Sequence, residues 1–267
     1  MKWTEEAETA IKKVPFFVRK RVRTKVEGFA GRAGKKIVTL ADVNTAREHY
    51  LKNMEEEVKG YRLDACFGQG GCPNRIHGSE ELAGRLETLL EGERLREFLK
   101  AQVDGPLKFH HEFRVTIADC PNACSQPQIK DIGIIGAAVP TLTDAECVMC
   151  GACETACAEA AVALDPCARR PVIDWERCLA CGQCAKVCPT GTIVEDRQGY
   201  RVLLGGKLGR HPRLAEELPG IYNDDGVVAI VKWCIDEWKR RSRKGKRFAD
   251  LVAEDPGLVD RVVAAVK

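Results

Sequence analysis

Two short runs of cysteine are the residues of this sequence whose type and spacing most directly indicate chemistry. The stretches CVMCGACETAC (147–157) and CLACGQCAKVCP (178–189) share the spacing C-x2-C-x2-C-x3-C. Three thiolates at every third residue surround one corner of an iron–sulfur cube, and a fourth, set further on, points to a second cluster. A zinc ribbon instead uses C-x2-C pairs separated by a longer loop. The pattern therefore predicts two 4Fe–4S clusters, rather than zinc or disulfides, with the ligands Cys147, Cys150, Cys153, Cys157, Cys178, Cys181, Cys184 and Cys188.

The segment between the two runs indicates how the ligands are shared. AVALD and PVIDW (161–165 and 171–175) are expected to be the strands of a short hairpin, and the whole stretch resembles bacterial ferredoxins. That resemblance implies crossed ligation, in which each run lends its last cysteine to the other cluster. One cluster would be held by Cys147, Cys150, Cys153 and Cys188, and the other by Cys178, Cys181, Cys184 and Cys157.

Four further cysteines form a separate pattern. ACFGQGGCPNR carries Cys66 and Cys72 as C-x5-C, and ADCPNACSQ carries Cys120 and Cys124 as C-x3-C. Cys66 and Cys72 taken alone are also compatible with ordinary buried thiols in a glycine-rich loop. Together, the four supply a complete ligand set for a third 4Fe–4S cluster.

These two spacings, with the attached CPNAC and DIGIIG, resemble the siroheme–4Fe–4S domain of the nitrite/sulfite reductase family. The resemblance implies that Cys124 both holds the cluster and bridges to the iron of a siroheme. It also implies a basic cradle for the siroheme carboxylates, which the family draws from two pseudo-repeated halves; this chain shows one half. The candidate cradle residues, each also compatible with a solvated surface charge, are Arg75, Arg114, Lys130, Lys207, Arg210 and Arg213.

Composition predicts a cytoplasmic protein without a membrane segment. The 267 residues include 14 cysteines, and the N-terminal MKWTEEAETA lacks the apolar core of a signal peptide. Cysteines kept in a reducing compartment favour metal over disulfides, and no apolar run approaches the length of a membrane helix. Two cysteines fit neither pattern. Cys234 shares an apolar helical face and is predicted to be a small buried hydrophobe, and Cys167 lies in a loop.

Net charge is only +3, but basic residues gather at 12–36 and 239–247. These runs are compatible with a solvated surface, or with docking of an acidic redox partner or cradling of an anionic cofactor. No motif that reads nucleic acid accompanies them, so nucleic acid is not an expected partner.

The N-terminal residues 1–58 carry no cysteine and are expected to be helical. Thr4, followed by glutamates, predicts a helix start, and Thr39 caps a further helix. VPFFVR (14–19) with RTKVEGFAGRAG (23–34) resembles the small helical domain of one subunit of light-independent protochlorophyllide reductase. The resemblance implies an accessory module of a redox enzyme.

The order of motifs predicts an insertion. In family members without a ferredoxin, a strand resembling DIGIIGAA leads almost directly into one resembling GYRVLLGGKLGRHPRL, whereas here the cysteine runs separate them. The expected fold is α+β: a nitrite/sulfite reductase-like half-domain with an inserted ferredoxin. We expect a helical module at 1–58, a siroheme/4Fe–4S domain at 59–140 and 196–267, and a ferredoxin domain with two clusters at 141–195.

Three clusters in one chain predict a path for electrons. The ferredoxin would accept them from a partner protein or subunit and pass them to the Cys124 centre, where sulfite or nitrite would be reduced. The alternatives are an electron-transfer subunit with three clusters and no siroheme or no substrate reduction, and a non-catalytic subunit that completes another chain's haem pocket. Because this chain shows only one half of the cradle, both alternatives stay open. The missing half could come from a second copy of the chain or from another subunit.

The three ligand sets predict a definite metal content. Protein reconstituted without oxygen should hold about twelve cluster irons, because each set completes one four-iron cube. Iron and sulfide analysis measures this, with alkylation of free thiols as the control. About eight irons and eight sulfides per chain, with Cys66 and Cys72 open to alkylation, would contradict the prediction of a third cluster.

Overall fold

The computed structural model describes residues 1–266, apart from the side chains of residues 51–54 and 69. It divides into two compact units, one of residues 1–59 with 103–110, the other of residues 60–102 with 111 onward. The expected helical module at 1–58 thus lies within the first unit. Residues 103–110, which the sequence placed in the reductase-like domain, also group with this unit, and their Leu107 is fully buried. Among the described residues, no helix is both long and apolar enough to cross a bilayer.

The first unit is helical, as expected. It contains α1 (Glu5–Lys12), α2 (Phe16–Arg32) and α3 (Leu40–Glu57), with β1 (Lys2–Trp3) paired to β2 (Ile37–Val38). The Thr4 side chain accepts the Ala7 N–H at 3.4 Å, and Thr39 forms a capping box with Asp42, so both predicted helix starts are confirmed. A small core forms from Ala7, Val26, Ala30 and Val38.

The second unit is built on a five-stranded sheet in the order β3-β4-β5-β8-β9. Strands β3 (Tyr61–Ala65), β4 (Phe113–Ala118) and β5 (Ile132–Leu142) are parallel, whereas β8 (Ile193–Leu204) and β9 (Glu216–Glu217) are antiparallel to their neighbours. Short 3-10 turns are η1 (Phe67–Gly70), η2 (Phe109–His111) and η3 (Pro127–Ile129). The helices are α4 (Glu80–Gly92), α5 (Leu95–Gln102), α8 (Asp224–Arg241), α9 (Phe248–Glu254) and α10 (Leu258–Val266).

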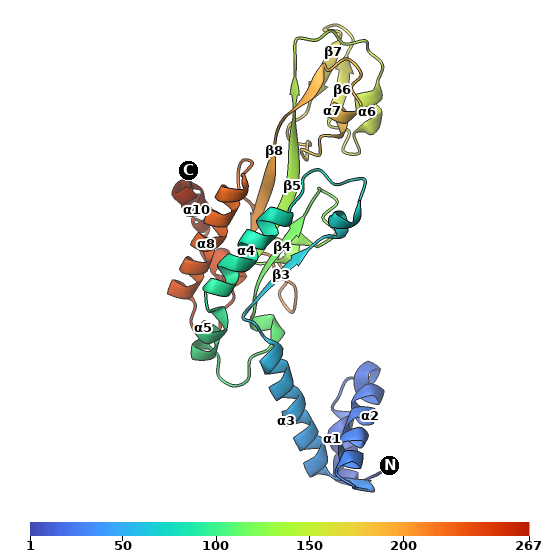
Figure 1. Ribbon diagram of the computed structural model, residues 1–267, viewed down its shortest axis with the longest axis vertical. Coiled ribbons are helices and arrows are strands. Elements are labelled where there is room, and N and C mark those ends of the chain that lie inside the picture. The colour runs from blue at the N-terminus through green and yellow to red at the C-terminus, as the bar shows by residue number, and fades with distance from the viewer. Residues whose placement is uncertain (267) are drawn as a thin grey trace. The chain divides into compact units, whose positions relative to one another are not determined.

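Helices α4 and α8 cover one face of this sheet (Figure 1). They do so because alternate strand residues are apolar on that face. The ring of Phe113 lies 5.1 Å from that of Trp238 and 5.5 Å from that of Phe248. Cys234 is fully buried in the same core, which confirms its prediction as a small hydrophobe.

Strands β5 and β8 continue beyond the sheet as a long antiparallel pair, and the chain between them forms a cysteine-rich lobe, defined here as residues 143–192 (Figure 1). The lobe contains α6 (Ala152–Ala156), α7 (Gln183–Lys186), and the hairpin of β6 (Val162–Asp165) and β7 (Arg170–Ile173). The hairpin expected between the cysteine runs is confirmed. Cys153, Val162, Ile173, Cys184 and Ile193 form the core of the lobe.

The two ends of the lobe meet. Leu142 pairs with Ile193, and the Thr143 N–H donates to the Thr192 carbonyl at 2.9 Å. Replacing residues 143–192 with an Asn-Gly turn should therefore leave the sheet folded, because a two-residue turn closes strands in this register. We expect cooperative thermal unfolding and about four cluster irons, measured by circular dichroism and iron analysis. Non-cooperative unfolding relative to the intact chain would show that the lobe and the sheet form one inseparable core.

Candidate metal centres

The first group of thiols forms where two parallel strands end. Cys66 directly follows β3, Cys120 lies just after β4, and the Cys66 N–H donates to the Ile117 carbonyl at 2.9 Å. This bond holds the two strand ends, and the loops that follow them, side by side. Burial raises the pKa of Cys120, and the neighbouring thiols of Cys66, Cys72 and Cys124 raise it further. The structure thus brings together the C-x5-C and C-x3-C pairs, with Cys120 buried and Cys124 exposed.

Backbone N–H groups are directed at one sulfur of this set. Cys66 Sγ accepts from the N–H of Gly68 at 3.4 Å and from that of Asp119 at 3.3 Å. The loops reach this geometry through left-handed residues, Gly71 at φ 93° and Ala123 at φ 52°. These two bonds hold the Cys66 sulfur where the loop after β3 meets the loop after β4.

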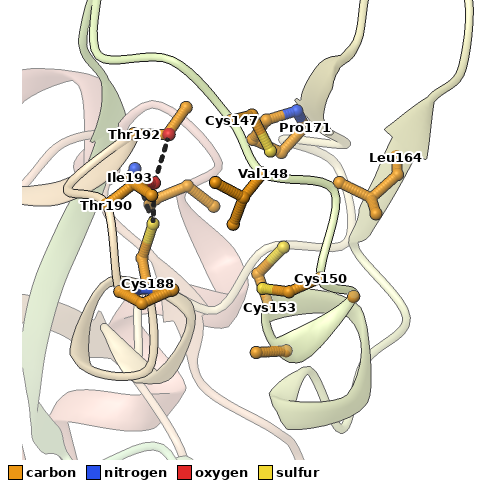
Figure 2. A pocket seen from close by; sticks show the side chains of 13 residues that line it. Cys147, Val148, Cys150, Cys153, Leu164, Pro171, Cys188, Thr190, Thr192 and Ile193 are labelled. Carbon is orange, nitrogen blue, oxygen red and sulfur yellow. Dashed lines mark hydrogen bonds between the residues drawn. The ribbon is translucent and has the colours of Figure 1, made fainter.

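A second group of thiols lines a pocket in the cysteine-rich lobe. Figure 2 shows the four cysteines arranged around Val148, and they are Cys147, Cys150, Cys153 and Cys188. Cys188 Sγ accepts the N–H of Ile193 at 3.4 Å, and Cys147 Sγ accepts that of Met149 at 3.4 Å. The structure therefore gathers the first three cysteines of one run with the last of the other, as crossed ligation requires.

The third group of thiols lines a larger cavity of about 380 Å³. Its cysteines are Cys157, Cys178, Cys181 and Cys184, and Cys120 of the first group lines the same cavity. The Ala138 N–H on β5 donates to the Ala180 carbonyl at 2.7 Å, which fastens the Cys178–Cys181 loop to the sheet. Burial raises the pKa of Cys184 to about 11; the backbone N–H of Ala185 opposes this rise, and the neighbouring thiols add to it.

The spread of these thiols suits clusters rather than single ions. Among residues 1–266, no three His, Cys, Asp or Glu side chains converge closely enough to hold one metal ion. A 4Fe–4S cube takes one thiolate at each of four separate corners, so four cysteines placed around a pocket match its demand. All three sets fit this group by donor type and number.

The basic residues predicted to cradle siroheme are mostly engaged by acids. Arg75 lies beside Asp119, with Nε 3.2 Å from Oδ2, and Lys130 Nζ lies 3.2 Å from Asp64 Oδ2. Lys207 pairs with Asp250.

The remaining three candidates lie in different settings. The backbone N–H of Arg114 donates to Asp131 at 3.0 Å. Arg213 pairs with Glu216 and also donates to the Gly205 carbonyl at 2.9 Å, and Arg210 is exposed in the loop after β8. The Lys130 side chain reaches Asp64 near the end of β3, whereas Lys207 follows β8 at the end of the sheet opposite Cys66 and Cys120. Of the six, Arg75 lies directly beside the Cys66–Cys72 loop, where its backbone N–H donates to the Cys72 carbonyl at 3.2 Å. The exposed thiol of Cys124 fits the role of a siroheme ligand. The basic side chains that are paired with acids would have to leave those acids to bind the siroheme carboxylates.

Two further charged residues belong to the site, although the cysteine spacing does not point to them. Asp119 is 1% exposed between the thiol-bearing loops. The Nη1 group of Arg201 donates to the Leu179 carbonyl in the Cys178–Cys181 loop at 3.4 Å. The position of Asp119 immediately before Cys120 could have indicated its place in the site. The contact of Arg201 joins residues 22 positions apart, and no feature of the sequence indicates it.

Comparison with known proteins identifies the family. Residues 61–255 match the nitrite and sulphite reductase 4Fe-4S domain, so the chain belongs to that family. It is 35% identical over 146 residues to the coenzyme F420-dependent sulfite reductase of Methanocaldococcus jannaschii (55% of this chain, 21% of that protein). It is 29% identical over 138 residues to one of the subunits of the anaerobic sulfite reductase of Salmonella typhimurium (46% and 36%). The chain thus spans about a fifth to a third of these relatives.

The fold and the N-terminal segment have relatives of their own. A crystal structure of dissimilatory sulfite reductase I superposes with a TM-score of 0.52, over 82% of this chain and 57% of that one. At 13% identity this shows a shared fold. Residues 3–47 match the proto-chlorophyllide reductase 57 kD subunit family. A 48-residue stretch is 50% identical to one of the subunits of the light-independent protochlorophyllide reductase of Pelodictyon phaeoclathratiforme (18% of this chain, 9% of that protein). The resemblances to the nitrite/sulfite reductase family and to the protochlorophyllide reductase subunit are confirmed.

Two thiols of the lobe should differ in reactivity once iron is removed. Partial burial opposes ionisation of Cys188, but the N–H of Ile193 and the hydroxyl of Thr190 outweigh it and lower its pKa. Cys184, with a pKa of about 11, should carry a thiolate fraction roughly 100-fold below that of an ordinary thiol at neutral pH. In chelator-stripped protein, alkylation followed by mass spectrometry should reach half-maximal rate at lower pH for Cys188. Equal pH midpoints for the two would contradict the geometry.

Proposed function

We propose that this chain conducts electrons through three 4Fe–4S clusters to a coupled cluster–siroheme centre at Cys124, where sulfite or nitrite is reduced. The observation that carries the proposal is the shared cavity, lined both by Cys120 and by the set Cys157, Cys178, Cys181 and Cys184. Two of the three ligand sets thus face one space. Membership of the nitrite and sulphite reductase family supports the proposal.

The shared cavity also supports an order for the clusters. Residues 141–195 would be an inserted ferredoxin on the domain formed by 59–140 and 196–267. Its Cys147 set would receive electrons from a partner protein or subunit, since that pocket is lined only by residues of the lobe and the start of β8. The Cys157 set would be second, because it shares its cavity with Cys120. The bond from Ala138 to Ala180 holds that loop in place.

At the Cys124 centre, the residues of this chain contribute metal ligands and charged side chains. The clusters would supply one-electron transfer, and siroheme, when bound, would supply the iron chemistry that reduces a small anion. Cys66, Cys72, Cys120 and Cys124 hold the cluster, with Cys124 as the shared ligand. Arg75, Arg114, Lys130, Lys207 and Arg210 are the candidate basic contacts for the carboxylates and the anion, either within this chain or with a second protein chain that completes the pocket.

A second candidate function is electron transfer alone. The pairing of Lys130 with Asp64 and of Lys207 with Asp250 favours it, because both cations already have partners within the chain. In that case the three clusters would pass electrons to another subunit, without a siroheme here.

Replacing Cys124 separates the two functions. In protein purified anaerobically from a host that makes siroheme, Cys124→Ser should abolish the red absorption bands of siroheme and about four cluster irons together. A serine oxygen is a harder ligand that suits iron–sulfur bonding poorly. Visible spectra, iron analysis and sulfite or nitrite reduction with a low-potential donor provide the measurement.

Cys167→Ser is the matched control, since this exposed thiol belongs to none of the three sets. It should leave the spectrum and the iron content unchanged. Unmodified protein that carries three clusters but no tetrapyrrole would reject the reductase proposal and retain the electron-transfer one.

A further inference from the structure

A buried carboxylate lies between the two loops that carry the first thiol set. Asp119 is 1% exposed, and its Oδ1 accepts a 2.6 Å hydrogen bond from the hydroxyl of Ser79, which is itself fully buried. Its Oδ2 faces Nε of Arg75 at 3.2 Å. Neither of these two facing atoms has a hydrogen-bond partner in the described part of the chain, so they attract each other mainly as charges.

Asp119 also contacts the cysteine loops through its backbone. Its N–H donates to Cys66 Sγ at 3.3 Å, and its carbonyl accepts from the N–H of Ile76 at 3.0 Å. The carboxylate lies directly against Gly68, where a methyl group would overlap Oδ2. One residue therefore fastens the Cys66–Cys72 loop, the segment that leads into α4, and the start of the Cys120–Cys124 loop.

We propose that Asp119, paired with Arg75, is a positioning residue that holds the Cys66, Cys72, Cys120 and Cys124 loops together and sets the reduction potential of their cluster. This inference rests on the proposed third cluster. Arg75, a candidate siroheme contact by sequence, here acts through Asp119, and its other partner is the exposed Glu80.

The physical reason is the charge gained on reduction. Reducing a cluster adds one negative charge, and fixed charges close to it in a buried site act with little screening. The Asp119 carboxylate disfavours reduction and the Arg75 guanidinium favours it, so the pair balances while both are present. Removing either one exposes the other.

The test measures reduction potentials of single variants by EPR-monitored redox titration of the anaerobically purified chain. Asp119→Asn should move one cluster wave to a more positive potential, because it removes a buried negative charge beside the thiol loops. Arg75→Gln should move the same wave to a more negative potential, because it leaves Asp119 unbalanced. A purely structural contact would be broken equally by both variants, and would shift the wave in the same direction or not at all.

A matched ion pair provides the control. Arg85 Nη2 lies 2.6 Å from Asp225 Oδ1 between α4 and α8, and neither residue lines a thiol pocket. Asp225→Asn and Arg85→Gln make the same chemical changes away from the thiols. They should leave every cluster wave in place.

Each result decides the inference. Potential shifts of opposite sign in the two variants support it. It is also supported if Asp119→Asn alone loses about four irons while Arg75→Gln moves the cluster wave to a more negative potential. Unmoved waves, shifts of the same sign, or loss of all three clusters from Asp119→Asn would overturn it. If the unmodified protein shows only two cluster waves, the proposed third cluster is rejected, and this inference with it. If it shows three waves and neither variant moves any of them, this inference alone is rejected.

Discussion

The parallel pairing of β3 with β4 is the constraint on which the first metal centre depends. Ala65 pairs with Ile117, so both strands end at the same edge of the sheet and deliver Cys66 and Cys120 together. Parallel neighbours require a crossover connection; α4 and α5 lie within it, and α4 packs against β3. A register slip of one residue would reverse the side chains of β3 and separate Cys66 from the loop of Cys120. The site therefore depends on the packing that fixes this register.

Strand β5 extends the same constraint to the lobe. On one side it pairs with β4, and on the other its whole length pairs with β8. Its Ala138 bonds the loop between Cys178 and Cys181, so one strand borders both the first thiol set and the set across the shared cavity. Pairing with β4 ends at Ile135, and beyond it β5 and β8 continue toward the lobe, with a register shift between Val139 and Pro140. The relative placement of two cysteine sets thus depends on one continuous backbone.

Local patterns in the sequence predicted local structure well. Cysteine spacing identified the three thiol sets, the short segments AVALD and PVIDW identified β6 and β7, and threonines identified two helix starts, because each signal lies within a few residues. Contacts between distant segments could not be predicted from such local patterns. The pairing of Lys130 with Asp64 spans 66 residues and that of Lys207 with Asp250 spans 43. Sequence therefore suggested basic residues for a cradle, whereas folding supplies several of them with acids.

Burial links the thiol sets to the metal they are suited to hold. In each set at least one thiol has its pKa raised by burial: Cys120, Cys153, and both Cys178 and Cys184. At neutral pH the metal-free fold holds these sulfurs protonated, and their contribution to its stability would be lost as the pH rises through the raised values. Iron binding removes the protons and places positive charge where thiolates would otherwise repel one another. These buried thiols thus suit the metal-free fold in their neutral form, and a bound cluster would stabilise their thiolate form.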